Sequence, residues 1–201
     1  HVYLAHDFDR QVPQEETLLA FDDLRRAGKI GVAGASNFSG EQLAEALEIA
    51  ELEGLGRYEV VQNTFSLLEQ GDRETVFPVC REHGVGYESF GPLAGGWLSG
   101  KYGRDTTPPA GSRMTQRPEP YERYRTPAVW TALETMRDRA AMLGVSMSAL
   151  SLAWLLGLEE MTGVVIGPNR VEHLDDVETA LALSLSDGER DEIGEVFEWE
   201  S

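Results

Sequence analysis

The chain is poor in cysteine, in basic residues and in long apolar runs, and each shortage narrows what it can be. Cys80 is the only cysteine among 201 residues. It cannot form an internal disulfide, which fits a reducing compartment such as the cytoplasm. Lysine and arginine total 17 against 35 aspartates and glutamates, for a formal net charge of -18. A general nucleic-acid binder needs a basic face, so this charge argues against one.

No apolar run reaches the roughly 18 residues of a membrane-spanning helix, and the first residues lack the pattern of a signal peptide. We therefore expect a cytoplasmic protein without a membrane or nucleic-acid partner. The four histidines are scattered and match no metal-ligand spacing, so we expect no metal. The chain opens inside an apolar segment with no initiating methionine, which suggests that it was cut from something longer.

Strand-like and helix-like segments alternate along the chain. Short apolar runs predict strands, and apolar residues at helical spacing predict helices. The strands are predicted at 2–6, 30–35, 59–62, 85–90 and 164–166. The helices are predicted at 14–27, 39–54, 71–83, 127–143, 147–157, 171–182 and 187–197. This alternation predicts an α/β protein with a parallel sheet and right-handed crossovers.

Five such units are fewer than a closed parallel barrel needs, which is eight units and roughly 250 residues. The sheet is therefore either open or part of a barrel that lacks its first three units. We expect one domain over residues 1–201, interrupted by a long loop at about 91–126. Five of the nine prolines lie within 103–127. Residues 101–125 contain six basic and three acidic residues. Such a loop suits a basic lid over phosphate, or it is an ordinary solvated loop.

Polar side chains stand where three of the predicted strands end. His6 closes 2–6, Ser36 and Asn37 follow 30–35, and Gln62 closes 59–62. In parallel α/β proteins these carboxyl ends face the ligand. Ser36, Asn37 and Gln62 together offer donors and acceptors suited to a neutral carboxamide, and His6 can donate to a carbonyl oxygen. Plain structural roles are the alternative: a helix cap and turn for Ser36 and Asn37, and buried polar groups for the other two.

Two further segments suit an aromatic ring and phosphates. Phe90 ends the fourth strand and offers a face for stacking. The glycines of 91–96 let backbone N–H groups approach a pyrophosphate. Residues 167–170 precede a predicted helix whose N-terminus favours anions, and Arg170 can bind a phosphate through two parallel hydrogen bonds.

Taken together, these segments resemble the aldo-keto reductases from Val2 to about Ile193. The strongest blocks are His6 to Asp9, Glu15 to Phe38, Gln62 to Leu68 and Gly84 to Tyr102. The resemblance implies a TIM (β/α)8 barrel, of which about five C-terminal β/α units are present. It implies an oxidoreductase that transfers hydride between NADPH and an aldehyde or ketone.

The resemblance also implies individual roles. His6 would be catalytic and would orient the reacting carbonyl. Ser36, Asn37 and Gln62 would hold the carboxamide of the cofactor, and Phe90 would stack on its nicotinamide ring. The pyrophosphate would be bound by Gly91, Pro92, Leu93 and Gly95. The 2′-phosphate would be bound by Gly167, Asn169, Arg170 and His173. The chain departs from the family at Phe65 and Phe90, where tyrosine is common, at Gly91, where serine is, and at Val177, where asparagine is. The resemblance of residues 167–173 to a 2′-phosphate site makes NADP the preferred cofactor, and the departures leave NAD possible.

The family's reaction uses a tyrosine, a lysine, an aspartate and a histidine, and only the histidine has a counterpart here, His6. Tyr3, Tyr87 and Lys101 occupy no matching position. Without a proton donor, hydride transfer would leave an unstabilised alkoxide, so we expect no carbonyl reduction by this chain alone. The alternative is a non-catalytic, nicotinamide-sensing interaction subunit, since open sheet edges recruit partners. Neither the substrate nor the oligomeric state follows from the sequence.

Overall fold

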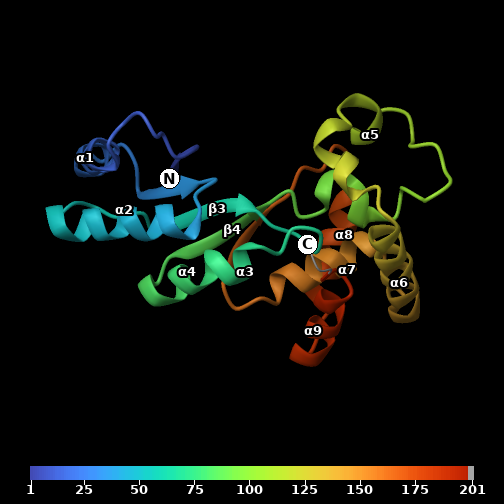
Figure 1. Ribbon diagram of the computed structural model, residues 1–201. Helices are drawn as coiled ribbons and strands as arrows, with labels where there is room; N and C mark the ends of the chain where they lie inside the picture. Colours follow the sequence, from blue (N-terminus) through green and yellow to red (C-terminus); the bar gives the residue numbers. More distant parts are fainter. Residues whose placement is uncertain (199–201) are drawn as a thin grey trace. The chain divides into compact units, whose positions relative to one another are not determined.

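The computed structural model describes residues 1–198 and divides the chain into two compact units (Figure 1). The first unit contains His1–Phe65, Glu69–Phe90 and Glu160–Val164. The second contains Ser66–Leu68, Gly91–Glu159 and the chain from Val165 onward. The expectation of a single domain over 1–201 stays a prediction.

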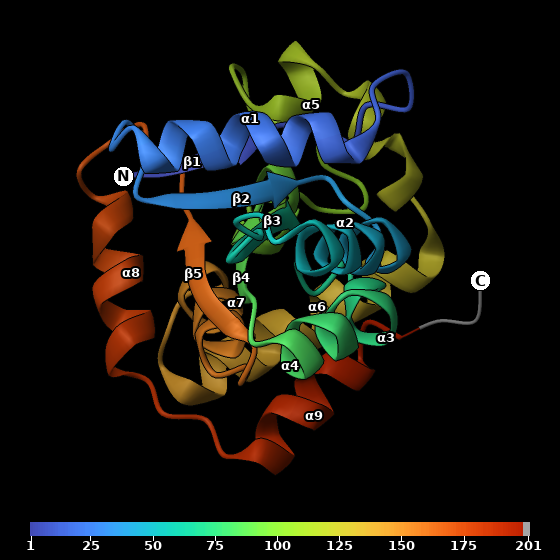
Figure 2. The ribbon, with the colours of Figure 1, turned by 90° about the vertical axis from the view of Figure 1, so that its left-hand side faces the viewer.

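The first unit is built on a sheet whose five strands lie in chain order (Figure 2). The first four strands pair in parallel, with Ala5 opposite Ala35, Ser36 opposite Gln62, and Gln62 opposite Glu88. The strands are β1 (Val2–Ala5), β2 (Val32–Ser36), β3 (Val60–Thr64), β4 (Gly86–Phe90) and β5 (Met161–Val165). The predicted alternation of strands and helices is confirmed.

Helices follow the first three strands: α1 (Gln14–Arg26), α2 (Gly40–Glu53), α3 (Asp72–Thr75) and α4 (Phe77–His83). Helix α2 begins with a capping box in which Ser39 and Gln42 satisfy each other's backbone N–H groups. Its apolar face, which contains Leu43, Leu47 and Ala50, is buried. Helix α1 buries Leu18 and Phe21, whereas its Leu19 is 48% exposed.

Several boundaries differ from the predictions. The helix expected at 71–83 breaks at Val76 into α3 and α4. Pro78 accounts for the break, because it has no N–H to continue the hydrogen-bond ladder and its ring restricts the residue before it. Strand β3 runs on to Thr64, so Gln62 lies inside the strand rather than at its end. Helix α8 begins at His173 rather than at 171.

Aromatic packing holds the helix-covered face of this sheet. The Phe77 ring lies 4.8 Å from that of Tyr87 and 5.0 Å from that of Phe65, measured between centroids. Cys80, on the same helix as Phe77, is also buried. Burial, followed by the nearby carboxylates of Asp72 and Glu160, raises the pKa of this thiol to about 12. The folded protein therefore holds Cys80 as an unreactive thiol.

The second unit is helical. Helix α7 is buried along nearly its whole length, from Met147 to Leu155. Trp97 centres an aromatic cluster, with ring centroids 4.8 Å from Trp130 and 5.5 Å from Tyr102. Its helices are η1 (Ala94–Ser99), α5 (Arg113–Gln116), η2 (Glu119–Tyr124), α6 (Pro127–Leu143), α7 (Met147–Leu156), α8 (His173–Ala182) and α9 (Asp187–Glu195). The loop expected at 91–126 thus contains three short helical segments.

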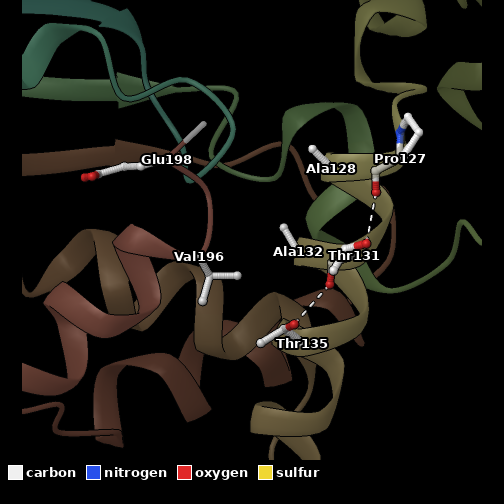
Figure 3. Close-up of a pocket in the computed structure, with 7 residues that line it drawn as sticks. All are labelled: Pro127, Ala128, Thr131, Ala132, Thr135, Val196 and Glu198. Carbon is white, nitrogen blue, oxygen red and sulfur yellow. Dashed lines mark hydrogen bonds between the residues drawn. The ribbon is translucent and has the colours of Figure 1, made fainter. Parts of the chain in front are cut away.

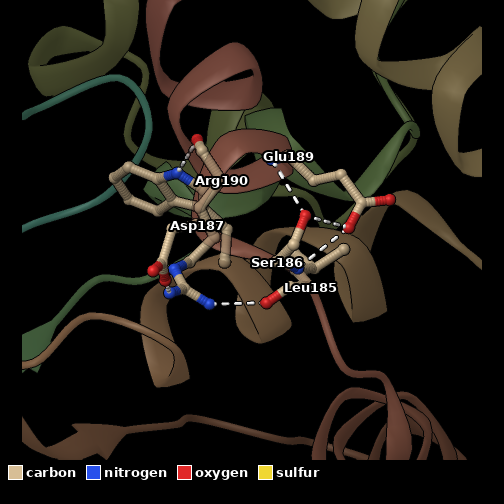
Figure 4. A network of polar contacts seen from close by, with 6 residues as sticks. Leu185, Ser186, Asp187, Glu189 and Arg190 are labelled. Atoms are coloured by element: carbon tan, nitrogen blue, oxygen red, sulfur yellow. Dashed lines mark hydrogen bonds and ion pairs between the residues drawn. The ribbon is translucent and has the colours of Figure 1, made fainter.

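A polar network fixes the start of α9 (Figure 4). Glu189 accepts hydrogen bonds from the backbone N–H (2.8 Å) and the hydroxyl (2.7 Å) of Ser186. These bonds hold the pKa of the Glu189 carboxyl below its usual range. The Arg190 side chain pairs with Asp187, and the backbone oxygen of Arg190 accepts from the Trp154 indole N–H at 3.0 Å. The network therefore ties α9 to α7.

Within residues 1–198, no single helix is long and apolar enough to cross a membrane. Helices α6 and α7 meet the length and composition requirements only as a pair, with a bend of 91° between them.

Candidate functional site

The strand register of the first unit places three polar side chains in one row. Ser36 of β2 lies opposite Gln62 of β3, and Gln62 lies opposite Glu88 of β4. Side chains of neighbouring residues on a strand alternate between faces, so these three share a face and Asn63 lies on the other. His6 follows Ala5, which pairs with Ala35, so His6 comes next to Ser36 at the carboxyl ends of the strands. The structure therefore brings together the polar residues that were predicted to meet at these ends.

Asn37 links β2 to the strands on either side of it, β1 and β3. Its side-chain amide donates to the backbone oxygen of His6 at 2.8 Å and to the hydroxyl oxygen of Ser36 at 3.1 Å. Its backbone N–H donates to the backbone oxygen of Gln62 at 3.2 Å. The Asn37 backbone is left-handed, with φ of 58°, a conformation that asparagine tolerates better than most residues. Helix α2 is capped by Ser39, so the alternative role of Ser36 and Asn37 as its cap is not what the structure shows.

This arrangement leaves one donor and one acceptor side by side. The amide of Asn37 donates to the Ser36 hydroxyl oxygen, so the Ser36 O–H stays available to donate. Among residues 1–198, nothing donates to the side-chain oxygen of Asn37. A primary carboxamide presents the matching pair, a carbonyl oxygen and an N–H. The chemistry of these two side chains therefore fits a carboxamide.

The Gln62 amide has a partner that the sequence did not indicate. Its nitrogen Nε2 donates to the carboxylate oxygen Oε2 of Glu88 at 2.8 Å. Both side chains are half-buried. Alternation along β4 could have placed Glu88 on this face, but the parallel register that sets it beside Gln62 is a long-range feature.

A second buried network supports the turn from the opposite face of the sheet. Asn63 accepts from the Phe38 N–H at 3.2 Å and donates to the Phe38 backbone oxygen at 2.8 Å. It also donates to Asp72 of α3 at 2.8 Å, and the Tyr87 hydroxyl donates to the same oxygen at 2.6 Å. Asn63 thus clamps the residue after Asn37. Sequence reasoning missed this residue, although a polar side chain on a helix-covered face requires partners.

This network excludes Tyr87 as a proton donor at the carboxyl ends of the strands. Its hydroxyl is engaged by Asp72, on the face opposite to Gln62 and Glu88. Burial, and then the Asp72 carboxylate, raise the pKa of Tyr87 far above its usual range. Tyr3 is 53% exposed on the edge strand β1.

Phe90 and the glycine-rich segment follow β4. Phe90 is the last residue of the strand, and its backbone oxygen accepts from the Phe65 N–H at 3.3 Å. In the second unit, Gly91, Ala94 and Gly95 have positive φ angles of 68°, 46° and 65°. A Cβ on Gly95 would lie 2.4 Å from the Tyr121 ring. Packing against Tyr121 is therefore sufficient to require glycine there, independently of any phosphate. Pro92 is buried and Leu93 half-buried.

The residues expected to bind the 2′-phosphate lie before and at the start of α8. Gly167, Asn169, Arg170 and His173 are all exposed, and Arg170 has no ion-pair partner among residues 1–198. The first turn of α8 carries Asp175 and Asp176, whose charges oppose anion binding at a helix N-terminus. The predicted basic lid is partly neutralised, since Arg104 pairs with Glu134 at 3.5 Å and Arg125 with Glu122 at 3.4 Å.

A shallow depression beside α6 is not a comparable site (Figure 3). Two threonine hydroxyls on it donate to their own helix, Thr131 to the Pro127 oxygen and Thr135 to the Thr131 oxygen, both at 3.0 Å. Among the described residues that line it, no polar side chains converge as a binding site requires. The lining residues are Pro127, Ala128, Thr131, Ala132, Thr135, Val196 and Glu198.

Residues 1–198 match the sequence model of the Aldo/keto reductase family, and the chain belongs to that family. Its sheet and alternating helices agree with part of the family's (β/α)8 barrel. Members of the family use nicotinamide cofactors.

Three relatives illustrate the range of the family. The "Uncharacterized oxidoreductase YrpG" of Bacillus subtilis is 35% identical over 92% of this chain and 54% of its own length. An L-glyceraldehyde 3-phosphate reductase of Escherichia coli O157:H7 is 31% identical, over 90% of the chain and 53% of its own length. The NADH-specific methylglyoxal reductase of Escherichia coli K12 is 27% identical, over 88% and 52%. The chain thus spans about half the length of the curated relatives it matches.

Proposed function

We propose that this chain supplies the nicotinamide-binding half of an aldo-keto reductase that transfers hydride between NADPH and an aldehyde or ketone. The observation that carries the proposal is the free donor and acceptor of Ser36 and Asn37 at the end of β2. When bound, the nicotinamide supplies the hydride. The chain's own residues bind and orient: Ser36, Asn37 and Gln62 hold the carboxamide, and the exposed His6 imidazole donates to the carbonyl oxygen of the substrate.

The remaining cofactor contacts follow from the resemblance and from exposure. Phe90 stacks on the nicotinamide ring, and the segment from Gly91 through Pro92 and Leu93 to Gly95 binds the pyrophosphate through backbone N–H groups. Gly167, Asn169, Arg170 and His173 bind the 2′-phosphate. Support for this last group comes from the exposed Arg170 guanidinium, which has no ion-pair partner within residues 1–198.

The NADPH preference rests on one cation, so Arg170→Ala is expected to weaken NADPH binding about fivefold and leave NADH binding unchanged. Asp175 and Asp176 oppose the phosphate, and they keep the expected effect of this exposed arginine small. A fluorescence titration that uses Trp97 measures both nucleotides. Lys29→Ala is the matched control, because it removes an exposed cation before β2 that pairs with no carboxylate in the part of the chain that the structure describes. Equal losses for NADPH and NADH in Arg170→Ala would place the 2′-phosphate elsewhere.

The purified 201-residue chain is expected to reduce no 4-nitrobenzaldehyde with NADPH. The expected physical cause is the lack of a proton donor for the developing alkoxide: the Tyr87 hydroxyl is committed to Asp72, and neither Tyr3 nor Lys101 matches a family position. The loss of NADPH absorbance with time measures this activity. Measurable turnover by the chain would contradict the prediction and identify an unrecognised acid.

A non-catalytic, nicotinamide-sensing interaction subunit is the second candidate. The edge strand β1 favours it, because Val2 and Tyr3 are 49% and 53% exposed and an unpaired strand edge can accept a partner strand. Nucleotide binding without turnover, together with capture of a partner that nucleotide releases, would favour this candidate. Cytoplasmic location and the absence of metal, nucleic-acid and membrane partners stay predictions.

A further inference from the structure

Glu88 is a carboxylate in the middle of a sheet strand, and it has one described partner. It lies between Tyr87 and Ser89 of β4, both of which are fully buried. Its oxygen Oε2 accepts from the Gln62 amide at 2.8 Å, and no cation pairs with it among residues 1–198. The neighbouring strand β5 lies against its stem, since a Cβ on Gly163 would be in ordinary van der Waals contact with its Cγ, at 3.5 Å.

The chemistry of Glu88 determines which end of the Gln62 amide is left for a ligand. An ionised carboxylate can only accept hydrogen bonds, so the amide must turn its nitrogen Nε2 toward Glu88. The oxygen Oε1 of Gln62 is then the other end of the group, and nothing donates to it among residues 1–198. Without the carboxylate, the two ends of the amide could exchange by a half-turn.

We propose that Glu88 is a positioning residue that makes Gln62 an acceptor, so that the site requires an N–H on the carboxamide of its nucleotide. This inference rests on the proposed function, because Gln62 must face the nicotinamide for it to hold. Ser36 and Gln62 are opposite each other in the register. Ser36 then donates to the carboxamide oxygen, whereas Asn37 and Gln62 accept from its two N–H groups.

A ligand without the N–H groups tests this assignment. The 3-acetylpyridine analogue of NADP⁺ keeps the carbonyl oxygen and replaces the NH₂ group with a methyl group. We expect the wild-type chain to bind NADP⁺ about tenfold more tightly than this analogue, from the loss of one to two hydrogen bonds. Calorimetric titration of the full 201-residue chain gives both dissociation constants without relying on turnover.

Two variants separate positioning from structural support. In Glu88→Leu nothing orients the amide, and in Glu88→Gln the neighbouring amide can either donate or accept. We expect the preference for NADP⁺ over the analogue to fall to about threefold in both variants, the contribution that remains from Asn37. Glu48→Gln controls for net charge and should keep the tenfold preference, because Glu48 is an exposed residue of α2 that forms no ion pair with the other described residues.

The outcomes are distinguishable. A preference that falls in both Glu88 variants and stays in Glu48→Gln supports the proposal. A preference that stays at tenfold in Glu88→Gln, with NADP⁺ still bound, overturns the role of Glu88 and leaves the proposed function intact. Failure of the wild-type chain to bind either nucleotide overturns the proposed function, and the role of Glu88 with it.

Discussion

Replacing Asn63 with alanine is expected to destabilise the first unit by about 3 kcal/mol, because it strands polar groups in a buried place. The Phe38 N–H and backbone oxygen both lose their side-chain partner, and Asp72 loses one of its two donors. Each buried group left unsatisfied costs about 1–3 kcal/mol. The expected loss exceeds that of an ordinary hydrogen bond for this reason.

The chain contains a separate reporter for each unit, which makes the effect measurable. Cys80 is the only cysteine and lies in the first unit. The tryptophans of the described residues, Trp97, Trp130 and Trp154, all lie in the second. Burial raises the pKa of the Cys80 thiol to about 12, whereas an unfolded cysteine titrates near pH 8.5. A disulfide reagent at pH 8 therefore reacts only with the opened first unit, and its rate in urea gives the free energy of opening.

Tyr87→Phe is the matched control for Asn63→Ala. It removes one donor to Asp72 and leaves the Asn63 clamp on Phe38 intact, so we expect a loss of about 1 kcal/mol. Equal losses in the two variants would show that the clamp on Phe38 contributes nothing beyond the contact with Asp72.

Gly40→Ala is expected to destabilise the first unit by about 2 kcal/mol, although alanine is the better helix former. Gly40 is the first residue of α2, and a Cβ there would lie 2.1 Å from the Thr75 backbone oxygen and 2.7 Å from its carbonyl carbon. Helix propensity favours alanine by about 1 kcal/mol. Overpacking against backbone costs typically 1–3 kcal/mol, occasionally more, and a backbone carbonyl cannot swing aside as a side chain can.

Gly188→Ala separates propensity from packing. Gly188 lies in the first turn of α9, and a Cβ there would meet nothing within 4 Å. We expect it to leave stability unchanged or to raise it by up to about 1 kcal/mol. Reagent access to Cys80 and tryptophan fluorescence in urea measure the two variants. A Gly40→Ala chain as stable as the parent would mean that α2 and α3 separate at little cost.

The sequence predicts the elements of this fold better than it predicts their contacts. Apolar runs and helical spacing located four strands and most helix ends to within about two residues, since these patterns are local. The fifth strand was also found, but β5 begins at Met161, three residues before its predicted start at 164. The break at Val76 was missed because Pro78 was counted within a helical pattern. The edge that brings together Ser36, Asn37 and Gln62 was predictable, because carboxyl ends of parallel strands share one side.

Two polar pairs support the residues at these strand ends, and they were not predictable in the same way. Gln62–Glu88 and Asn63–Asp72 each join residues of different elements, and only the register or the packing of a helix decides which polar side chains meet. The sequence shows that Asn63 and Glu88 are polar residues inside strands, and so require partners, but it does not say which partners they have.

The left-handed backbone of Asn37 also limits what mutation can do at this position. With φ of 58°, glycine, asparagine and aspartate are the residues that adopt the conformation at low cost. Glycine has no side chain to reach His6 and Ser36, and aspartate has no N–H to donate to the His6 oxygen. Asparagine is thus the one residue that meets both requirements at position 37. Selection for a working site should therefore remove most codon changes there, whereas exposed positions of α2 such as Glu48 can vary.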